Sequence, residues 1–132
     1  KVFPQVRHHR RCRFSEMWTM PERIIKRHDT RVTPRVRFLD EQQQPIVLTG
    51  LTVRYTLRAL GTTTLKINRA TATIPDQLVT PGEAFYQPVA ADVDTAGLYE
   101  EEWEIDYGSG SKESFPVKAQ IIVSILEDLD DV

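Results

Sequence analysis

The sequence contains a single cysteine among 132 residues and no long apolar run. Cys12 cannot form an internal disulfide, so the fold must be held by its hydrophobic core; this also fits assembly in a reducing cytoplasm. No stretch approaches the roughly 20 apolar residues that span a membrane, and the N-terminal stretch lacks the apolar segment of a secretory signal. The chain is long enough for one domain with a sizeable core and too short for two.

Short motifs that carry enzyme chemistry are also missing. There is no G-x-S-x-G elbow, Walker loop or G-x-G-x-x-G fingerprint. His8, His9 and Cys12 offer three metal ligands, but a zinc site needs a further ligand cluster with characteristic spacing. Asp92 and Asp94 lack the spacing of a calcium loop. We therefore expect no enzymatic activity, no metal and no cofactor.

Positive charge is concentrated at one end of the chain. Residues 1–37 hold eleven Lys/Arg and three Asp/Glu, a net charge of +8, whereas residues 38–132 hold six and sixteen, a net charge of −10. Such a division suits packing of the positive end of one copy on the negative body of another. Solvation of both sets of charges is the alternative.

The clearest pattern in the chain is the alternation over residues 98–107. Successive side chains of a strand point to opposite faces, so this stretch predicts a strand with one aromatic and one acidic face. The aromatic phase is interrupted only by Glu101. The two phases are Tyr99, Trp103, Ile105 and Tyr107 on one face, and Glu100, Glu102, Glu104 and Asp106 on the other.

A second clean alternation covers residues 51–59. If this strand lies beside residues 98–107, its outward Arg54 and Arg58 face the glutamates of the acidic phase, in cross-strand pairs of about 0.2–1 kcal/mol each. Further strands are expected at 23–26, 33–39, 65–74, 83–89 and 115–126. Seven to eight short strands with turn signals about every ten residues predict an all-β, antiparallel sandwich, with a closed barrel as the alternative.

Two side-chain sets allow a catalytic or a sugar-binding interpretation. Glu100, Glu102 and Glu104 follow one another at about 7 Å along a strand face, a separation seen in glycosidase carboxylate pairs. Any strand with an acidic outer face gives the same spacing, so we interpret them as a solvated or partner-binding face. The tyrosines and Trp103 are in phase with apolar neighbours and are expected in the core rather than in a sugar platform.

The N-terminal residues 1–22 show no periodicity and are interpreted as an extended arm, followed by a domain at 23–126 and an acidic tail at 127–132. The arm carries a basic run and large apolar residues that need a surface to cover them, on the domain itself or on a neighbour. Nucleic acid is not expected, because the attached domain is acidic. The predicted partner interface comprises Phe3, Arg7, Arg10, Arg11, Arg13, Phe14, Trp18, Glu100, Glu102 and Glu104.

Four segments resemble one known family. Residues 24–30 (IIKRHDT) resemble its "strand, then Gly-Asp-Thr" opening, with His28 where glycine is common. Residues 36–40 (VRFLD) followed by 45–53 (PIVLTGLTV) resemble its core motif, and residues 94–99 (DTAGLY) followed by 103–105 resemble its D-T-A-G-x-Y segment. With Phe115-Pro116 before the last strand, the resemblance covers residues 24–126. The family is the immunoglobulin-like N-terminal domain of tailed-phage baseplate upper proteins and related small virion proteins.

The resemblance implies an immunoglobulin-like β-sandwich that serves as a non-enzymatic structural part of a virion, assembled in the host cytoplasm. Its expected partners are other virion proteins and copies of itself in a symmetric assembly, with no membrane. The unmatched arm and the lack of a C-terminal receptor-binding extension favour a tail, baseplate or neck adaptor subunit. A capsid decoration protein and a carbohydrate-binding or adhesion module are the alternatives.

Overall fold

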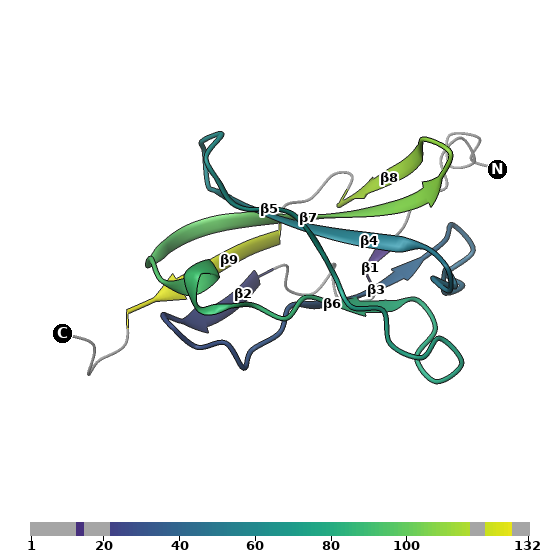
Figure 1. The fold of residues 1–132 in the computed structure, drawn as a ribbon, viewed down its shortest axis with the longest axis horizontal. Helices are drawn as coiled ribbons and strands as arrows, with labels where there is room; N and C mark the ends of the chain where they lie inside the picture. The colour runs from purple at the N-terminus through teal and green to yellow at the C-terminus, as the bar shows by residue number, and fades with distance from the viewer. Residues whose placement is uncertain (1–12, 15–21, 117–120, 128–132) are drawn as a thin grey trace.

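The computed structural model describes residues 13–14, 22–116 and 121–127, which form an immunoglobulin-like, all-β sandwich of two sheets (Figure 1). The expected fold class is confirmed. The three-stranded sheet has the order β1 (Arg13–Phe14), β3 (Arg35–Leu39), β6 (Glu83–Phe85). The six-stranded sheet has the order β2 (Glu22–Lys26), β9 (Ile121–Leu126), β7 (Gly97–Gly108), β4 (Thr52–Ala59), β5 (Leu65–Thr71), and β8 (Ser111–Phe115) also pairs with β7.

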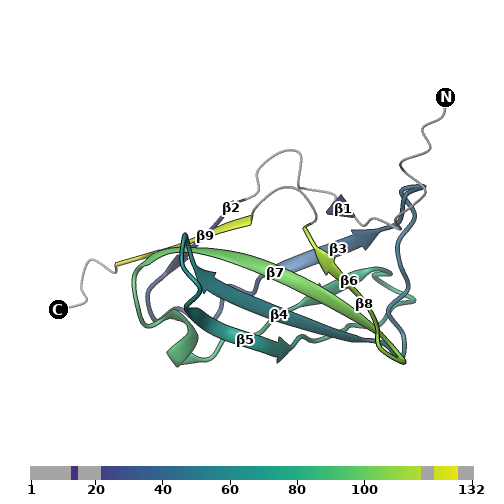
Figure 2. The ribbon, with the colours of Figure 1, turned by 90° about the horizontal axis from the view of Figure 1, so that it is seen from above.

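Strand β7 lies at the centre of the larger sheet (Figure 2). One of its edges pairs with β4 over eight positions, from Ala59 opposite Tyr99 to Thr52 opposite Asp106. Its other edge is shared, because β9 pairs with the first part of β7 and β8 pairs with the last part. The strand expected at 115–126 is observed as β9, from Ile121 to Leu126, whereas β8, at Ser111–Phe115, was not predicted from the sequence. Pro116 follows β8 directly, and its missing N–H cannot continue the ladder.

The pairing of β2 with β9 is parallel, which corrects the expectation of a wholly antiparallel arrangement. The successive strands β1 and β2 belong to different sheets, so the described strands form an open sandwich rather than a closed barrel. Other strand bounds also differ from expectation, and β5 ends at Thr71 rather than at residue 74. β3 begins at Arg35 because the preceding Pro34 has no N–H to donate, and β6 ends at Phe85, after which the Tyr86 N–H donates to the Pro34 carbonyl at 2.9 Å.

The corner before β7 has the geometry that the sequence motif led us to expect. A 3-10 turn, η2 (Ala90–Val93), precedes it, and the Tyr99 hydroxyl donates to the Thr95 carbonyl at 2.7 Å. A tyrosine at the start of this strand that bonds back to upstream backbone is a hallmark of immunoglobulin-like sandwiches. Residues 94–99 therefore fix how the chain enters β7.

The aromatic phase of β7 packs in the core, as predicted. Trp103 is fully buried, its ring centroid lying 4.7 Å from that of Tyr55, and Tyr55 stacks on Tyr86 at 4.9 Å. Tyr99 is buried and Tyr107 is half-buried. The hydrophobic core extends from Ile25 to Ile125, so both sheets contribute to it.

The backbone conformation of His28 explains why the resembled motif commonly has glycine at this position. His28 has φ +71°, in the left-handed region, which a residue with a Cβ adopts at a cost of about 1–3 kcal/mol. The conformation is held because the His28 N–H donates to the Val93 carbonyl at 2.8 Å, just before the tyrosine corner. The turn after β2 is thereby tied to the entry of β7.

Candidate protein-protein interface

The acidic phase of β7 faces away from the core beside β4. The register places Arg58 opposite Glu100, Thr56 opposite Glu102 and Arg54 opposite Glu104. The expected alignment of arginines with glutamates is therefore confirmed, and it follows from the shared two-residue period of the two strands.

Two of the three predicted interface glutamates already bind cations of their own sheet. The Arg58 Nε donates a hydrogen bond to Glu100 at 2.9 Å. Arg69 donates two hydrogen bonds to the carboxylate of Glu104, from Nε at 3.0 Å and from Nη2 at 3.2 Å. The hydrogen bond from Arg69 is the main cause that holds the pKa of Glu104 below its usual range. Exposed pairs of this kind contribute about 0–1 kcal/mol each. Their charges are balanced within the sheet, so the acidity of this face no longer argues by itself for a basic partner.

Glu102 is the exposed carboxylate of this face. Its side chain makes no ion pair within residues 13–14, 22–116 and 121–127. It borders a shallow pocket of about 200 Å³ on the outer side of the sheet, together with Arg58, Leu65 and Pro116. The prediction that this face contacts a basic partner therefore depends mainly on Glu102.

The predicted arm, residues 1–22, is described at Arg13, Phe14 and Glu22, and Glu22 is already the first residue of β2. The backbone of Arg13 and Phe14 pairs antiparallel with Leu39 and Phe38 of β3, so here the arm follows its own domain. The remaining predicted arm residues lie outside the described residues: Phe3, Arg7, Arg10, Arg11 and Trp18. Their contact with a neighbour stays a prediction.

Glu101, which no interface prediction included, is the most strongly bound carboxylate of β7. It is 3% exposed and lies in phase with the aromatic residues. Tyr55 Oη and Arg23 Nε donate to its Oε1 at 2.8 and 2.9 Å, while Trp103 Nε1 and Arg23 Nη2 donate to its Oε2 at 2.7 and 2.9 Å. The sequence signal was the single charged residue within the aromatic phase.

The contacts of Glu101 make it a structural group. Both oxygens accept two hydrogen bonds, so neither is left to bind a ligand or move a proton. Burial, and next the negative charge of Glu101, raise the pKa of Tyr55 well above its ordinary value, which keeps this hydroxyl a donor. Arg23 also donates to the Arg35 carbonyl of β3 at 3.0 Å, so the network joins the two sheets.

The two aspartates considered as calcium ligands also have partners within the chain. Asp92 accepts hydrogen bonds from the Tyr86 hydroxyl at 2.7 Å and the Val89 N–H at 2.9 Å. Asp94 pairs with Lys66 at 2.5 Å, and this contact is the main cause that lowers the pKa of Asp94. The described residues contain no group of three His, Cys, Asp or Glu side chains arranged to hold a metal.

The most exposed apolar side chain of the described residues lies in the loop between β5 and β6. Leu78 is 95% exposed and Val79 is 72% exposed, and Val47 of the neighbouring β3–β4 loop is 57% exposed. We call residues 75–82 the apolar loop. The sequence carries a faint signal of it, two apolar residues between the turn pairs Pro75-Asp76 and Pro81-Gly82.

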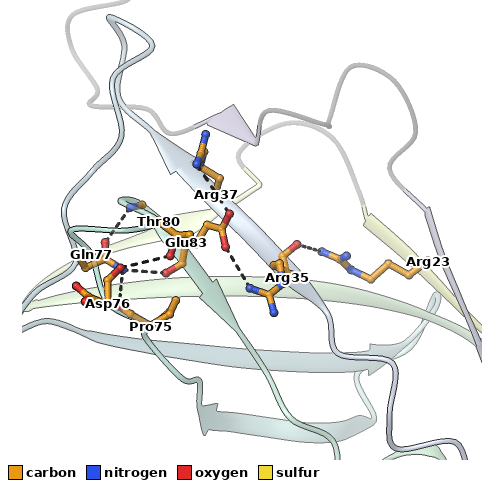
Figure 3. Close-up of polar contacts among 9 residues, drawn as sticks. Arg23, Arg35, Arg37, Pro75, Asp76, Gln77, Thr80 and Glu83 are labelled. Carbon is orange, nitrogen blue, oxygen red and sulfur yellow. Dashed lines mark hydrogen bonds and ion pairs between the residues drawn. The ribbon is translucent and has the colours of Figure 1, made fainter.

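Buried Gln77 holds the apolar loop in one conformation (Figure 3). Its Nε2 donates to the carbonyls of Pro75 and Glu83 at 3.0 and 3.2 Å. Its Oε1 accepts from the N–H groups of Leu48 and Gly82 at 3.0 and 2.8 Å. All four hydrogen-bonding positions of the amide are filled. The backbone of the apolar loop, which carries Leu78, is therefore held by these four hydrogen bonds.

Gly82 also holds the backbone at the end of the apolar loop. It has φ +85°, and a Cβ at this position would lie 2.8 Å from the Phe38 carbonyl oxygen. The backbone of residue 82 must therefore be that of glycine, which lets its carbonyl accept the Phe38 N–H at 2.8 Å.

Comparison of the sequence with protein-family models found no match, and comparison with curated proteins found none. Among the described residues, no helix is long and apolar enough to cross a membrane.

Proposed function

We propose that the chain is a non-enzymatic structural protein of a tailed-phage virion, a tail, baseplate or neck adaptor subunit, which joins its neighbours through protein–protein contacts. The observation that carries the proposal is the apolar loop. Leu78 is almost fully exposed in a segment whose backbone is fixed by Gln77. Because the loop backbone is already held, a contact through Leu78 costs little backbone entropy on binding, so the loop suits a contact between proteins.

The resemblance supplies the virion part of the proposal, and its motifs have structural roles that support it. Residues 94–99 form the tyrosine corner, and His28 has the backbone conformation of the glycine that is common at its position. These are features of a shared framework, and they support membership of the resembled family at the level of the fold.

Most of the carboxylates considered for chemistry have partners of the same chain, which supports a structural role. Arg58 binds Glu100, Arg69 binds Glu104, and Asp92 accepts hydrogen bonds from Tyr86 and Val89, whereas Glu102 makes no ion pair among the described residues. Of the aromatic side chains considered for a sugar platform, Tyr55, Tyr86, Tyr99 and Trp103 are buried and Tyr107 is half-buried.

The experiment replaces Leu78 with aspartate in the phage genome and measures the amount of the chain in purified particles by mass spectrometry. We expect the variant to fold with an unchanged melting temperature, because Leu78 contributes almost no buried area. We expect its content in particles to fall at least about tenfold, since a charge at the centre of an apolar contact costs several kcal/mol.

Val89→Asp is the matched control, because Val89 is 58% exposed in another loop and should tolerate the same change. Normal incorporation of the Leu78 variant would show that the apolar loop is no contact. Absence of the wild-type chain from particles would refute the virion proposal itself. Immunogold labelling of the capsid rather than the tail would favour the decoration alternative.

A further inference from the structure

Among the described strands, the larger sheet ends at β2. Strand β2 is five residues long, terminates the strand order and pairs only with β9 among the described strands. The Arg27 N–H donates to Leu126 of β9, so alternate residues back along the strand also point toward β9. The N–H and C=O groups of Glu22, Ile24 and Lys26 therefore point outward from the sheet, as on any unpaired edge strand.

The side chains of the same three residues lie on the outer face and are exposed. Ile24 is 60% exposed and is flanked two residues away by Glu22 on one side and Lys26 on the other. Glu22 and Lys26 are therefore equally far from Ile24 along the strand and carry opposite charges. A strand of this kind is complementary to a second copy of itself that runs in the opposite direction.

We propose that two copies of this chain associate by antiparallel pairing of β2 with β2 across a two-fold axis at Ile24. Each Ile24 then exchanges both backbone hydrogen bonds with Ile24 of the second copy, and each Glu22 lies opposite Lys26 of the second copy. The pairing is independent of the virion proposal, since it names a surface that the apolar loop does not include.

The charges select this register over its neighbours. A shift by two residues in either direction places Ile24 opposite Glu22 or Lys26 and leaves the other charged residue without an opposite partner. Opposite charges facing each other on one sheet face are favourable and like charges are unfavourable. The ends of the pair are weaker than its centre, because the Lys26 carbonyl already accepts the Asp29 N–H at 3.0 Å.

Two further exposed apolar side chains lie on the same outer face, behind the β2 edge. Ile24 and Leu98 lie on either side of Ser124 in one row across β2, β9 and β7, and Leu98 is 53% exposed. Leu126, which is 42% exposed, lies beside Lys26 in the next row. Pairing brings the two Ile24 side chains together at the axis; Figure 2 shows β2 as the last strand on its side of the larger sheet. The inner residues Arg23 and Ile25 keep their places in the core.

The test measures self-association of the full chain by sedimentation over a range of concentrations. We expect concentration-dependent dimers for the wild type. Glu22→Lys and Lys26→Glu each replace two attractive contacts by two repulsive ones, so each should weaken the dimer at least about tenfold. The double variant Glu22→Lys/Lys26→Glu is again complementary to itself and should dimerise like the wild type. An equimolar mixture of the two single variants should form mixed dimers.

Gln42→Lys, at an exposed position of the β3–β4 loop, is the control for added positive charge and should leave the dimer unchanged. Circular dichroism of each variant verifies that the sandwich is intact. A wild type that stays monomeric at every concentration overturns the proposal. So do single variants that dimerise normally, or a double variant that fails to recover, because the register requires both effects.

Discussion

Glu101 places a carboxylate inside a β-sandwich core, next to Trp103. A buried ion costs several kcal/mol unless hydrogen bonds and an opposite charge replace its water. Here the guanidinium of Arg23, the hydroxyl of Tyr55 and the indole of Trp103 fill every position around the two oxygens. The carboxylate thereby joins β2, β4 and β7 at one point. Removing Tyr55 or Trp103 would leave a buried oxygen short of a donor, and removing Arg23 would also leave the charge uncompensated.

Replacing Glu101 with glutamine should lower the free energy of unfolding by about 2–4 kcal/mol. The amide nitrogen of glutamine would face donors that need an acceptor, and Arg23 would lose its counter-charge. Urea denaturation at neutral pH measures the change. Glu102→Gln is the matched control, because the adjacent side chain is exposed, and it should stay within about 0.5 kcal/mol of the wild type. Equal effects at the two positions would contradict the structural role of Glu101.

Tyr55 makes the free energy of unfolding fall with rising pH in the alkaline range. Burial and the neighbouring Glu101 raise its pKa in the folded state well above the value of about 10 in the unfolded chain. As pH rises past 10 the unfolded chain therefore releases this proton first, so the stabilisation present below pH 10 is lost as pH climbs toward the folded pKa. Tyr55→Phe should cost about 1–2 kcal/mol at neutral pH and flatten the fall above pH 10. Denaturant titrations from pH 7 to 11 measure both; parallel curves for the two proteins would refute the assignment.

At the scale of strands, alternation was sufficient to predict β4 and β7 as strands; their pairing was only a condition of the sequence argument, and the structure supplies it. Val53, Tyr55 and Leu57 are buried in β4 as Trp103 and Ile105 are in β7. A slip of one residue would expose every one of these side chains, so the apolar phase specifies the register. The facing of arginines and glutamates follows from that register and needs no further information.

Other features of the same strands depend on contacts between distant residues, which a local pattern does not contain. Nothing around Glu101 in the sequence indicates that Arg23, 78 residues away, would reach it. The parallel pairing of β2 with β9 likewise joins the two ends of the domain. The rigidity of the apolar loop depends on one amide, Gln77, which bonds to Leu48 of another loop. The candidate contact at Leu78 therefore became visible only from exposure and hydrogen bonding in the structure.

At the scale of the whole molecule, folding and association use different parts of the chain. All described core residues lie between Ile25 and Ile125. The candidate contacts are at the apolar loop and the β2 edge, and the first twelve residues add the basic charge of Lys1, Arg7, Arg10 and Arg11. The outer face of β7 is largely balanced by Arg58 and Arg69, so this basic segment has little unpaired charge to meet on its own sheet.

Deletion of residues 1–12 tests this separation while keeping the β1 pairing of Arg13 and Phe14 with β3. We expect a free energy of unfolding within about 0.5 kcal/mol of the full chain, because no described core residue is removed. We expect strongly reduced incorporation into particles, because the deletion removes four Lys/Arg that we propose bind a neighbouring subunit. Urea denaturation measures the first effect and mass spectrometry of purified particles the second. Replacing Arg7, Arg10 and Arg11 with glutamine keeps the length and removes the charge, so it should reproduce the loss if charge carries the contact. A truncated chain that incorporates normally would contradict the predicted role of the arm and leave the apolar loop and the β2 edge as the contacts that hold the subunit.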